Sequence, residues 1–288
     1  MVCLRPMSIP RLIVSQIVSR ALEEDLGRGD LTTEACVEET AEGAAALVAR
    51  ETAVFCGGEI VREVYAQLDP RVTVTLHRKD GDKVQPGTSL LTLRGPARSL
   101  LEGERVALNF CQRLSGVATL TRAYVDALPP GSKTRIADTR KTTPGLRAFE
   151  RHAVRAGGGH NHREDLSAAV LIKDNHIAAA GGVGPAIERC RARSAHTSRI
   201  ECEVDTIEQL EVALAHRADI VLLDNFDDAA LERAQKLIAG RAIVEVSGGV
   251  KLERVAQIAR LGVDVISVGA LTHSARAVDL GLDWTEAS

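Results

Sequence analysis

The stretch ADTRKTTPGLRAFERHAVRAGGGHNHREDLSAAVLIKDNHI, from Ala137 to Ile177, sets the fold and the chemistry that we expect of this chain. It surrounds the run Gly157-Gly158-Gly159 with cationic and imidazole side chains. These are Arg140, Lys141, Arg147, Arg151, His152, Arg155, His160, His162, Arg163, Lys173 and His176. Many of them stand at the ends of apolar runs or in glycine-rich turns, where backbone N–H groups and long cations converge. The stretch therefore predicts a site for anions.

Outward from this stretch, short apolar strands alternate with helices after Pro129-Pro130-Gly131. The strands are expected at Thr134–Thr139, Ala168–Asp174, Arg199–Asp205, Ile220–Asn225, Ala242–Ser247 and Val263–Gly269. The helices between them are expected at Pro144–Arg155, Pro185–Arg193, Ile207–His216, Ala229–Ile238 and Leu252–Leu261. Serial β/α repetition indicates a parallel sheet with right-handed crossovers, and its short, even spacing favours a barrel over an open sheet.

The N-terminal part has a different rhythm. After Pro10, apolar residues recur at helical spacing up to Leu22, which predicts an amphipathic helix. The following elements are a strand at Ala44–Phe55, a helix from Gly57 to Leu68, strands at Val72–Leu76 and Leu90–Leu93, and a helix at Ala97–Leu128 interrupted near Ser115-Gly116. This mixture predicts a small α+β domain. We place it at residues 1–115, and a catalytic α/β domain at residues 116–288.

Composition narrows the class of protein. The chain has 288 residues, of which 45% are hydrophobic, and a formal net charge of −3. This charge argues against a nucleic-acid footprint over the whole surface, and one Trp, two Tyr and four Phe make base-stacking platforms improbable. Six cysteines without a C-x-x-C pair indicate reduced thiols in a cytoplasmic protein. The N-terminus does not read as a signal peptide, and no apolar run is long enough for a membrane span.

The polar residues of the C-terminal part lie where the expected strands end. They are Asp138-Thr139-Arg140-Lys141, Lys173-Asp174, Glu203 and Asp205, Asp224-Asn225, Ser247-Gly248-Gly249, and Gly269. The carboxyl ends of barrel strands meet at one rim, which is where active sites of β/α barrels are built. Cations there suit carboxylates and phosphates, and the carboxylates of Glu203, Asp224 and Asp174 suit sugar hydroxyls, Mg²⁺ or a cationic sugar. Glycine turns before helices suit phosphate, so together the rim predicts phosphoribosyl transfer.

Three segments, DTRKTTPGLR, GGGHNHR and LIKDNHI, resemble the signatures of the quinolinate phosphoribosyltransferases, a type II phosphoribosyltransferase family of glycosyltransferases. The resemblance extends, more weakly, over nearly the whole chain. It implies an incomplete α/β barrel beside an N-terminal α+β sandwich, with a last helix that packs back on the sandwich. It further implies quinolinate and phosphoribosyl pyrophosphate as substrates, Mg²⁺ as cofactor, a step in NAD biosynthesis, and a homodimer.

The resemblance also implies roles for individual residues. The quinolinate carboxylates are assigned to Arg105, contributed across a dimer interface, and to Arg140, His162, Arg163 and Lys173. Lys141 is assigned to a position between the substrate and a phosphate group, with Thr139 beside it. Glu203 and Asp224 are assigned to the ribose hydroxyls and to the metal, and Asp174 is a further candidate ligand of the metal. Catalysis is assigned to Lys141, Glu203 and Asp224. The 5-phosphate is assigned to Ser247, Gly248, Gly249, Val268, Gly269 and Ala270.

Other interpretations of the same residues stay open. Lys173 at a strand end suits a Schiff-base aldolase, and His160 and His162 with Asp138, Glu203 or Asp224 suit a zinc hydrolase. A third interpretation is that the chain is a divergent member of the family, of the kind found in molybdate operons. Any single cation of the rim could equally belong to a structural ion pair instead of binding substrate. Glu201, Glu203 and Asp205 occupy alternate positions along one strand, so all three share one face.

Overall fold

The β/α repetition of the C-terminal part folds as the sequence indicates. The computed structural model describes residues 9–285. The chain forms two compact units: unit 1 comprises the residues up to Arg122, Thr142–Gly158 and the residues from Leu271 onward, and unit 2 comprises Ala123–Lys141 and Gly159–Ala270. We describe each unit by itself.

Unit 2 holds a parallel sheet of six strands among the described residues, in the order β6-β11-β10-β9-β8-β7. The strands are β6 (Arg135–Ala137), β7 (Val170–Ile172), β8 (Ile200–Val204), β9 (Ile220–Asp224), β10 (Ile243–Ser247) and β11 (Val265–Ser267). The first strand pairs with the last, as in a barrel, whereas β6 and β7 end the sheet without pairing with each other. The expected α/β class and incomplete barrel are confirmed.

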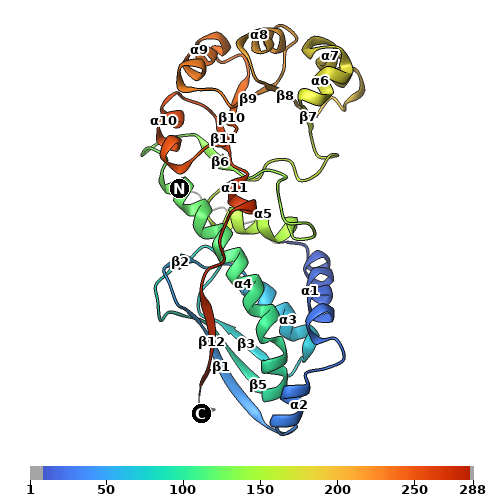
Figure 1. The fold of residues 1–288 in the computed structure, drawn as a ribbon, viewed down its shortest axis with the longest axis vertical. Helices are drawn as coiled ribbons and strands as arrows, with labels where there is room; N and C mark the ends of the chain where they lie inside the picture. Colours follow the sequence, from blue (N-terminus) through green and yellow to red (C-terminus); the bar gives the residue numbers. More distant parts are fainter. Residues whose placement is uncertain (1–8, 286–288) are drawn as a thin grey trace. The chain divides into compact units, whose positions relative to one another are not determined.

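Helices cover the outer face of this curved sheet (Figure 1). They are α6 (Asp174–Ala180), α7 (Val183–Arg193), α8 (Ile207–Ala215), α9 (Asp228–Ile238), and the 3-10 turn η1 (Leu252–Arg254) that leads into α10 (Val255–Arg260). Each expected helix of this region is present, but α6 was not foreseen. It begins directly after Lys173, where His176 accepts a hydrogen bond from the Lys173 amide through Nδ1 (3.0 Å). The motif LIKDNHI is therefore a strand end joined to a helix start.

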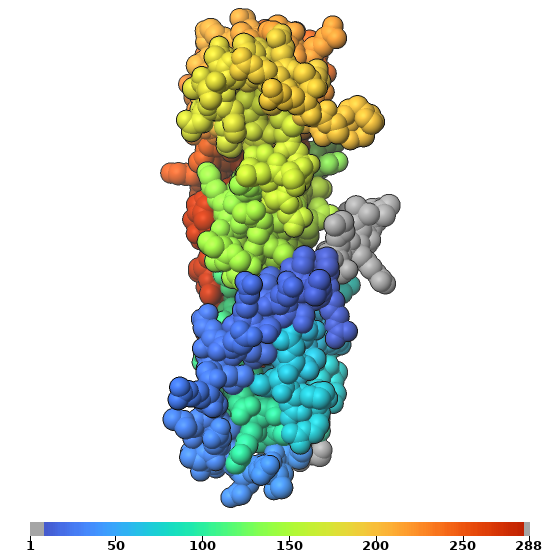
Figure 2. Space-filling model, turned by 90° about the vertical axis from the view of Figure 1, so that its right-hand side faces the viewer, coloured from blue at the N-terminus to red at the C-terminus, as the bar shows by residue number. Residues whose placement is uncertain are grey.

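Unit 1 is built on an antiparallel sheet in the order β12-β1-β5-β3. The strands are β1 (Glu42–Ala49), β3 (Thr73–Leu76), β5 (Ser89–Pro96) and β12 (Leu280–Thr285), and a separate pair is β2 (Ala53–Val54) with β4 (Lys83–Val84). The helices are α1 (Arg11–Leu26), α2 (Leu31–Cys36), α3 (Gly58–Leu68), the long α4 (Ala97–Asp126), α5 (Arg147–Ala156) and the short α11 (Ala270–His273). Helix α1, dark blue, lies on the surface beside α3 (Figure 2). Tyr65 of α3 is buried and donates to the carbonyl of Leu100 in α4 (3.0 Å).

Three local features differ from the sequence-based expectations. Helix α4 runs unbroken through Ser115-Gly116, because Ser115 accepts the amide of Cys56 (3.0 Å) and a Cβ at Gly116 would lie 2.0 Å from the Arg276 carbonyl. The small pair thus marks close packing rather than a helix end. The expected strand Ala44–Phe55 divides into β1 and β2. The last element is a strand, β12, which pairs with the edge of β1, and not a helix.

The chain returns to unit 1 twice, whereas the sequence suggested one division near residue 115. The excursion at Thr142–Gly158 carries α5, which was expected among the barrel helices. Its apolar face is buried in unit 1, where Phe149 packs edge-on against Phe110 with ring centroids 5.3 Å apart. None of the helices in residues 9–285 combines the length and the apolar character needed to cross a bilayer.

Candidate active site

The carboxyl ends of β7, β8 and β9 bring opposite charges together in unit 2. Lys173 follows β7, and its Nζ lies 2.6 Å from Oε2 of Glu203 in the neighbouring strand β8. Burial raises the pKa of Asp224 at the end of β9, and the charge of Asp205 raises it further, while Lys173 and Lys141 oppose the rise. These shifts arise only among charges that are close in space. The strand ends that the sequence singled out therefore gather at one rim.

Two arginines add to the cations of this rim. Burial lowers the pKa of Arg163, and the like charge of Arg140 lowers it further. Arg163 donates through Nη1 to the carbonyl of Ala169 (3.0 Å), and its buried Nε has no hydrogen-bond partner among the described residues. Two neighbouring guanidinium groups repel each other unless an anion lies between them, and a dicarboxylate provides planar acceptors for both.

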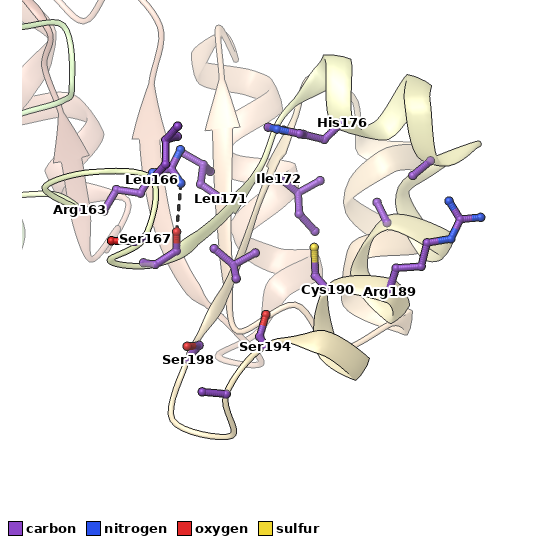
Figure 3. A pocket seen from close by; sticks show the side chains of 15 residues that line it. Arg163, Leu166, Ser167, Leu171, Ile172, His176, Arg189, Cys190, Ser194 and Ser198 are labelled. Carbon is purple, nitrogen blue, oxygen red and sulfur yellow. Dashed lines mark hydrogen bonds between the residues drawn. The ribbon is translucent and has the colours of Figure 1, made fainter.

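Figure 3 shows a pocket of about 590 Å³ that extends from Arg163 along β7 and α7. Its walls include Leu171, Ile172 and Cys190. A dashed line marks the hydrogen bond that Arg163 donates to the Ala169 carbonyl. Of the residues to which we assigned a substrate or metal, Arg163 alone lines this pocket. Because its lining is mostly apolar, the pocket does not suit a phosphorylated sugar. The polar rim is the better candidate for the site of chemistry.

The segment GGGHNHR is fixed next to β6 by a buried carboxylate. Asp138 accepts the amide of His162 through Oδ1 (2.7 Å) and the side-chain amide of Asn161 through Oδ2 (2.6 Å). His160 forms a parallel bridge with Ala137 of β6. Asp138 is fully buried, and a buried carboxylate is stable when its oxygens are hydrogen-bonded in this way. Asp138 therefore serves the site by holding the loop that carries His162 and Arg163.

His162 lies between two buried glutamates that the sequence analysis did not assign to the site. Its Nε2 is 3.3 Å from Glu201 and 3.4 Å from Glu245, both of which are 4% exposed. Glu245 stands in the otherwise apolar strand AIVEVS, and Glu201 is two residues before Glu203 on the same strand face. A charged residue inside an apolar strand is the signal that could have identified both. The structure thus gives His162 protein partners in addition to the substrate role expected of it.

The contacts of His162 favour different protonation states of the ring. Although burial lowers the pKa of His162, hydrogen bonds with Glu201 and Glu245 outweigh it and raise the pKa to about 10. The amide of Arg163 approaches Nδ1 (2.7 Å), which requires that nitrogen to carry no proton. Two buried carboxylates outweigh one neutral backbone hydrogen bond, because charge-assisted bonds are about twice as strong. We therefore expect the ring to be protonated between the two carboxylates, with the Arg163 amide contact at Nδ1 as the weaker, opposing interaction.

The raised pKa of His162 predicts how stability depends on pH. An unfolded histidine has a pKa near 6.5, so the ion pairs of His162 stabilise the fold fully below that pH and are lost as pH rises through about 10. We expect the free energy of unfolding, measured with urea, to fall between pH 6.5 and about 10. The free energy of unfolding of the His162→Gln variant should fall less over this range. Equal slopes for the two proteins would contradict a protonated His162.

Two groups of side chains among residues 9–285 have the spacing of metal ligands, and neither is the zinc set suggested by the sequence. One is His162 with Glu201 and Glu245, described above. The other is Cys56, Asp80 and His152 in unit 1, where His152 Nε2 lies 2.7 Å from Asp80 Oδ2. The other oxygen of Asp80 accepts the amides of Gly57 and Gly58 at the start of α3. A helix cap and an ion pair account for this second group.

The remaining residues of the expected site lie as follows. Gly248 and Gly249 after β10 have φ of +90° and +57°, and a Cβ at Gly248 would lie 2.3 Å from Asn225 Oδ1, so this turn requires glycine. Val268 after β11 donates its amide to Ala137 (2.9 Å), which places Gly269 and Ala270 at the start of α11. Thr139 accepts the amide of Lys141 (3.1 Å). Arg105 is exposed on α4 in unit 1.

A β/α barrel with cations, carboxylates and glycine turns at one rim defines an enzyme class that handles anionic, phosphorylated substrates. Comparison with known proteins then identifies the family within this class. Residues 30–115 match the N-terminal domain of quinolinate phosphoribosyl transferase, and residues 117–283 match its C-terminal domain. The chain belongs to the quinolinate phosphoribosyltransferase family.

The chain aligns with its relatives over nearly their whole length. The chain is 43% identical to a probable nicotinate-nucleotide pyrophosphorylase (carboxylating) of Bacillus subtilis, covering 95% of this chain and 94% of that protein. It is 44% identical to nicotinate-nucleotide pyrophosphorylase (carboxylating) of Mycobacterium leprae, covering 92% and 95%. The structure of nicotinate-nucleotide pyrophosphorylase from Francisella tularensis superposes with a TM-score of 0.91 at 38% identity, covering 98% and 99%.

Proposed function

We propose that this enzyme transfers the phosphoribosyl group of phosphoribosyl pyrophosphate to quinolinate and removes the C2 carboxylate. The products are nicotinate mononucleotide, pyrophosphate and CO₂, and the step belongs to NAD biosynthesis. The observation that carries the proposal is the Lys173–Glu203 pair beside Asp224, which places a cation for an acid and carboxylates for a sugar at one rim. Membership of the family and the names of the relatives support the same activity.

The chemistry divides into two steps. In the first, the quinolinate ring nitrogen forms a bond to ribose C1 while the bond from C1 to pyrophosphate breaks, and Glu203 and Asp224 stabilise the positive charge that develops on the sugar. In the second, the bond from C2 to its carboxylate breaks, CO₂ leaves, and a proton from water takes its place. In between, the electron pair stays at C2, where the positive charge of the adjacent pyridinium nitrogen stabilises it, so the chain needs no electron-sink cofactor of its own.

We assign the quinolinate carboxylates to Arg140, Arg163 and Lys173, with His162 adding its charge nearby. Lys141 is assigned to the phosphate groups, with Thr139 at its amide. The glycine turns at Ser247–Gly249 and at Val268–Ala270 are assigned to the 5-phosphate, because each directly follows one of the last barrel strands, where phosphate sites of β/α barrels are commonly built.

Mg²⁺ suits this rim by the chemistry of its donors. Asp224 has other carboxylates close enough to raise its pKa, among them Asp205 and Asp174, and carboxylate oxygens are the ligands that Mg²⁺ prefers. We propose that Asp174, Glu203 and Asp224 hold the ion together with the pyrophosphate of the substrate. When bound, the ion neutralises charge on the departing pyrophosphate.

The aldolase alternative is not supported by Lys173. Its Nζ is held by Glu203 at 2.6 Å, whereas a Schiff-base lysine has to offer an unshared electron pair to a carbonyl. The direct test of the proposal is an assay of the purified chain with quinolinate, phosphoribosyl pyrophosphate and Mg²⁺. Equimolar release of CO₂ and formation of nicotinate mononucleotide are expected. Absence of both products under conditions where the chain is folded would overturn the proposed function.

We further propose a cytoplasmic homodimer. The cysteines among the described residues are free thiols, as expected in a reducing compartment. Arg105 is exposed and has no substrate role within its own unit, so we assign it to the quinolinate site of a second copy.

The shared-site arrangement predicts complementation between inactive variants. Arg105→Ala and Lys173→Ala should each have low activity alone. After unfolding and refolding together, mixed dimers would contain one intact site, so up to about a quarter of wild-type activity should return, since half of the dimers are mixed and each has one of two sites intact. Steady-state rates of the refolded mixtures measure this. Activity no higher than the average of the two variants would argue against Arg105 acting across an interface.

A further inference from the structure

A buried ion pair in unit 1 lies outside the rim that the proposed function uses. Arg113 of α4 donates to Oε1 of Glu150 in α5 through Nη2 (2.7 Å) and Nε (3.2 Å). Glu150 is 0% exposed, and the Arg113 side chain is 26% exposed. Replacing such a pair by apolar residues is often neutral or stabilising, so stability alone is a weak explanation for its presence.

Glu150 also fixes the backbone that follows Lys141. Its Oε2 accepts the amide of Thr143 (2.9 Å), and its Oε1 accepts the Thr143 hydroxyl (2.7 Å). Thr143 stands two residues after Lys141 and three after Arg140. Both bonds that Thr143 donates end on a carboxylate that cannot turn, because Arg113 holds its Oε1. The Thr143 hydroxyl also accepts a long hydrogen bond from Arg113 Nη2 (3.5 Å). The conformation of the TRKTT segment is thus tied to Glu150.

Arg113 performs the same task for a second segment. Its Nη1 donates to the carbonyl of Ala275 (2.7 Å), and its Nη2 donates to the carbonyl of Thr272. Thr272 stands two residues after Ala270, and Gly269-Ala270 is one of the turns assigned to the 5-phosphate. One ion pair therefore anchors the chain directly after the segment assigned to phosphate and substrate carboxylates, and directly after one of the two turns assigned to the 5-phosphate.

We propose that Arg113 and Glu150 are positioning residues, acting through Thr143 and Thr272 to set the Arg140-Lys141 segment and the Gly269-Ala270 turn. The proposal rests on the proposed phosphoribosyl transfer. A catalytic constellation has to be held within about half an ångström of its productive geometry, and loops rarely achieve this without buried supporting bonds. Arg113 supplies such bonds to the Thr272–Ala275 segment directly and to Thr143 through Glu150.

Three variants separate positioning from folding. Thr143→Val keeps the ion pair and removes the hydroxyl's bonds with Glu150 and Arg113, whereas Glu150→Gln keeps the shape and removes the charge. His152→Gln is the matched control, because His152 also anchors α5 in unit 1, through Asp80 at 2.7 Å, but has no bond to Thr143. Each variant is assayed for kcat and for the KM of both substrates, for its melting temperature, and for amide hydrogen exchange in peptides covering residues 139–146.

We expect Thr143→Val to lower kcat/KM for phosphoribosyl pyrophosphate about tenfold and Glu150→Gln about a hundredfold, since a displacement of 1 Å can cost about that much. Thr143→Val and His152→Gln should melt at similar temperatures, yet of these two only Thr143→Val should speed amide exchange at Thr142 and Thr143 and lose activity. Equal activity in the two, or unchanged exchange in Glu150→Gln, would overturn the positioning role. If the wild-type chain is itself inactive, the proposed function fails, while the exchange data still test the anchor.

Discussion

Lys173→Ala is expected to lower kcat/KM for quinolinate at least about a thousandfold without unfolding the protein. The substitution removes the cation that we assign to a quinolinate carboxylate and leaves Glu203 without its partner at 2.6 Å. Removing one preorganised charge from a site of this kind costs about 10²–10³ in rate, and disturbing Glu203 as well adds to the loss. The Lys173 side chain is 45% exposed, so the fold should tolerate its truncation.

Lys236→Ala is the matched control for this experiment, because Lys236 is an exposed lysine on α9, away from the strand ends. Its activity should stay within about twofold of wild type, since surface substitutions away from such features have small effects. Melting temperatures of both variants establish that any loss of turnover is not a loss of fold. Near-normal turnover of Lys173→Ala would remove Lys173 from the site and weaken the assignment of the whole β7–β8 edge.

Nicotinate is expected to replace quinolinate very poorly, with kcat/KM lower by about four orders of magnitude. Nicotinate lacks the C2 carboxylate, so it would leave the neighbouring Arg140 and Arg163 without one of their anions. A site built to bind a charged substrate group rejects an analogue lacking that group by about 10⁴–10⁵, because buried polar groups are left unpaired. The measurement compares formation of nicotinate mononucleotide from the two acids at equal phosphoribosyl pyrophosphate.

Arg163→Ala sharpens this comparison. It should reduce the rate with quinolinate far more than the small residual rate with nicotinate, so the preference between the two acids should shrink. The repulsion from Arg140 that lowers the pKa of Arg163 would also disappear, which favours the fold of this variant. Equal rates for quinolinate and nicotinate in the wild-type enzyme would instead indicate a nicotinate-specific transferase.

Much of the fold could be read from local patterns. The six barrel strands and their helices were located within a few residues, because apolar runs of strand length and helical spacing depend on neighbouring residues only. The gathering of Lys141, Lys173, Glu203 and Asp224 could also be foreseen, since parallel strands deliver their carboxyl ends to one rim. The glycines after β10 and β11 were informative for the same reason.

Other features could not be read from the chain. Gly116 suggested a helix end but serves close packing against the Arg276 carbonyl, 160 residues further on (276 − 116). Glu201 was recognised only as a neighbour of Glu203 on one strand face, and Glu245 was not singled out, whereas the fold places both beside His162. Glu150 was not singled out from the sequence, and it is fully buried against Arg113. In each case the partner is distant in sequence, and no local pattern encodes it.

The sequence by itself determined most of the elements of this protein, the barrel class of its C-terminal part and the set of charged residues at the strand ends. Periodicity and strand polarity are local properties, so they survive without coordinates. Only the tertiary structure decided that α5 and β12 belong to unit 1, that Asp138 holds the His162 loop, and that the Arg113–Glu150 pair anchors Thr143 and Thr272. A buried charge is stable only with partners, and folding chooses those partners from across the chain.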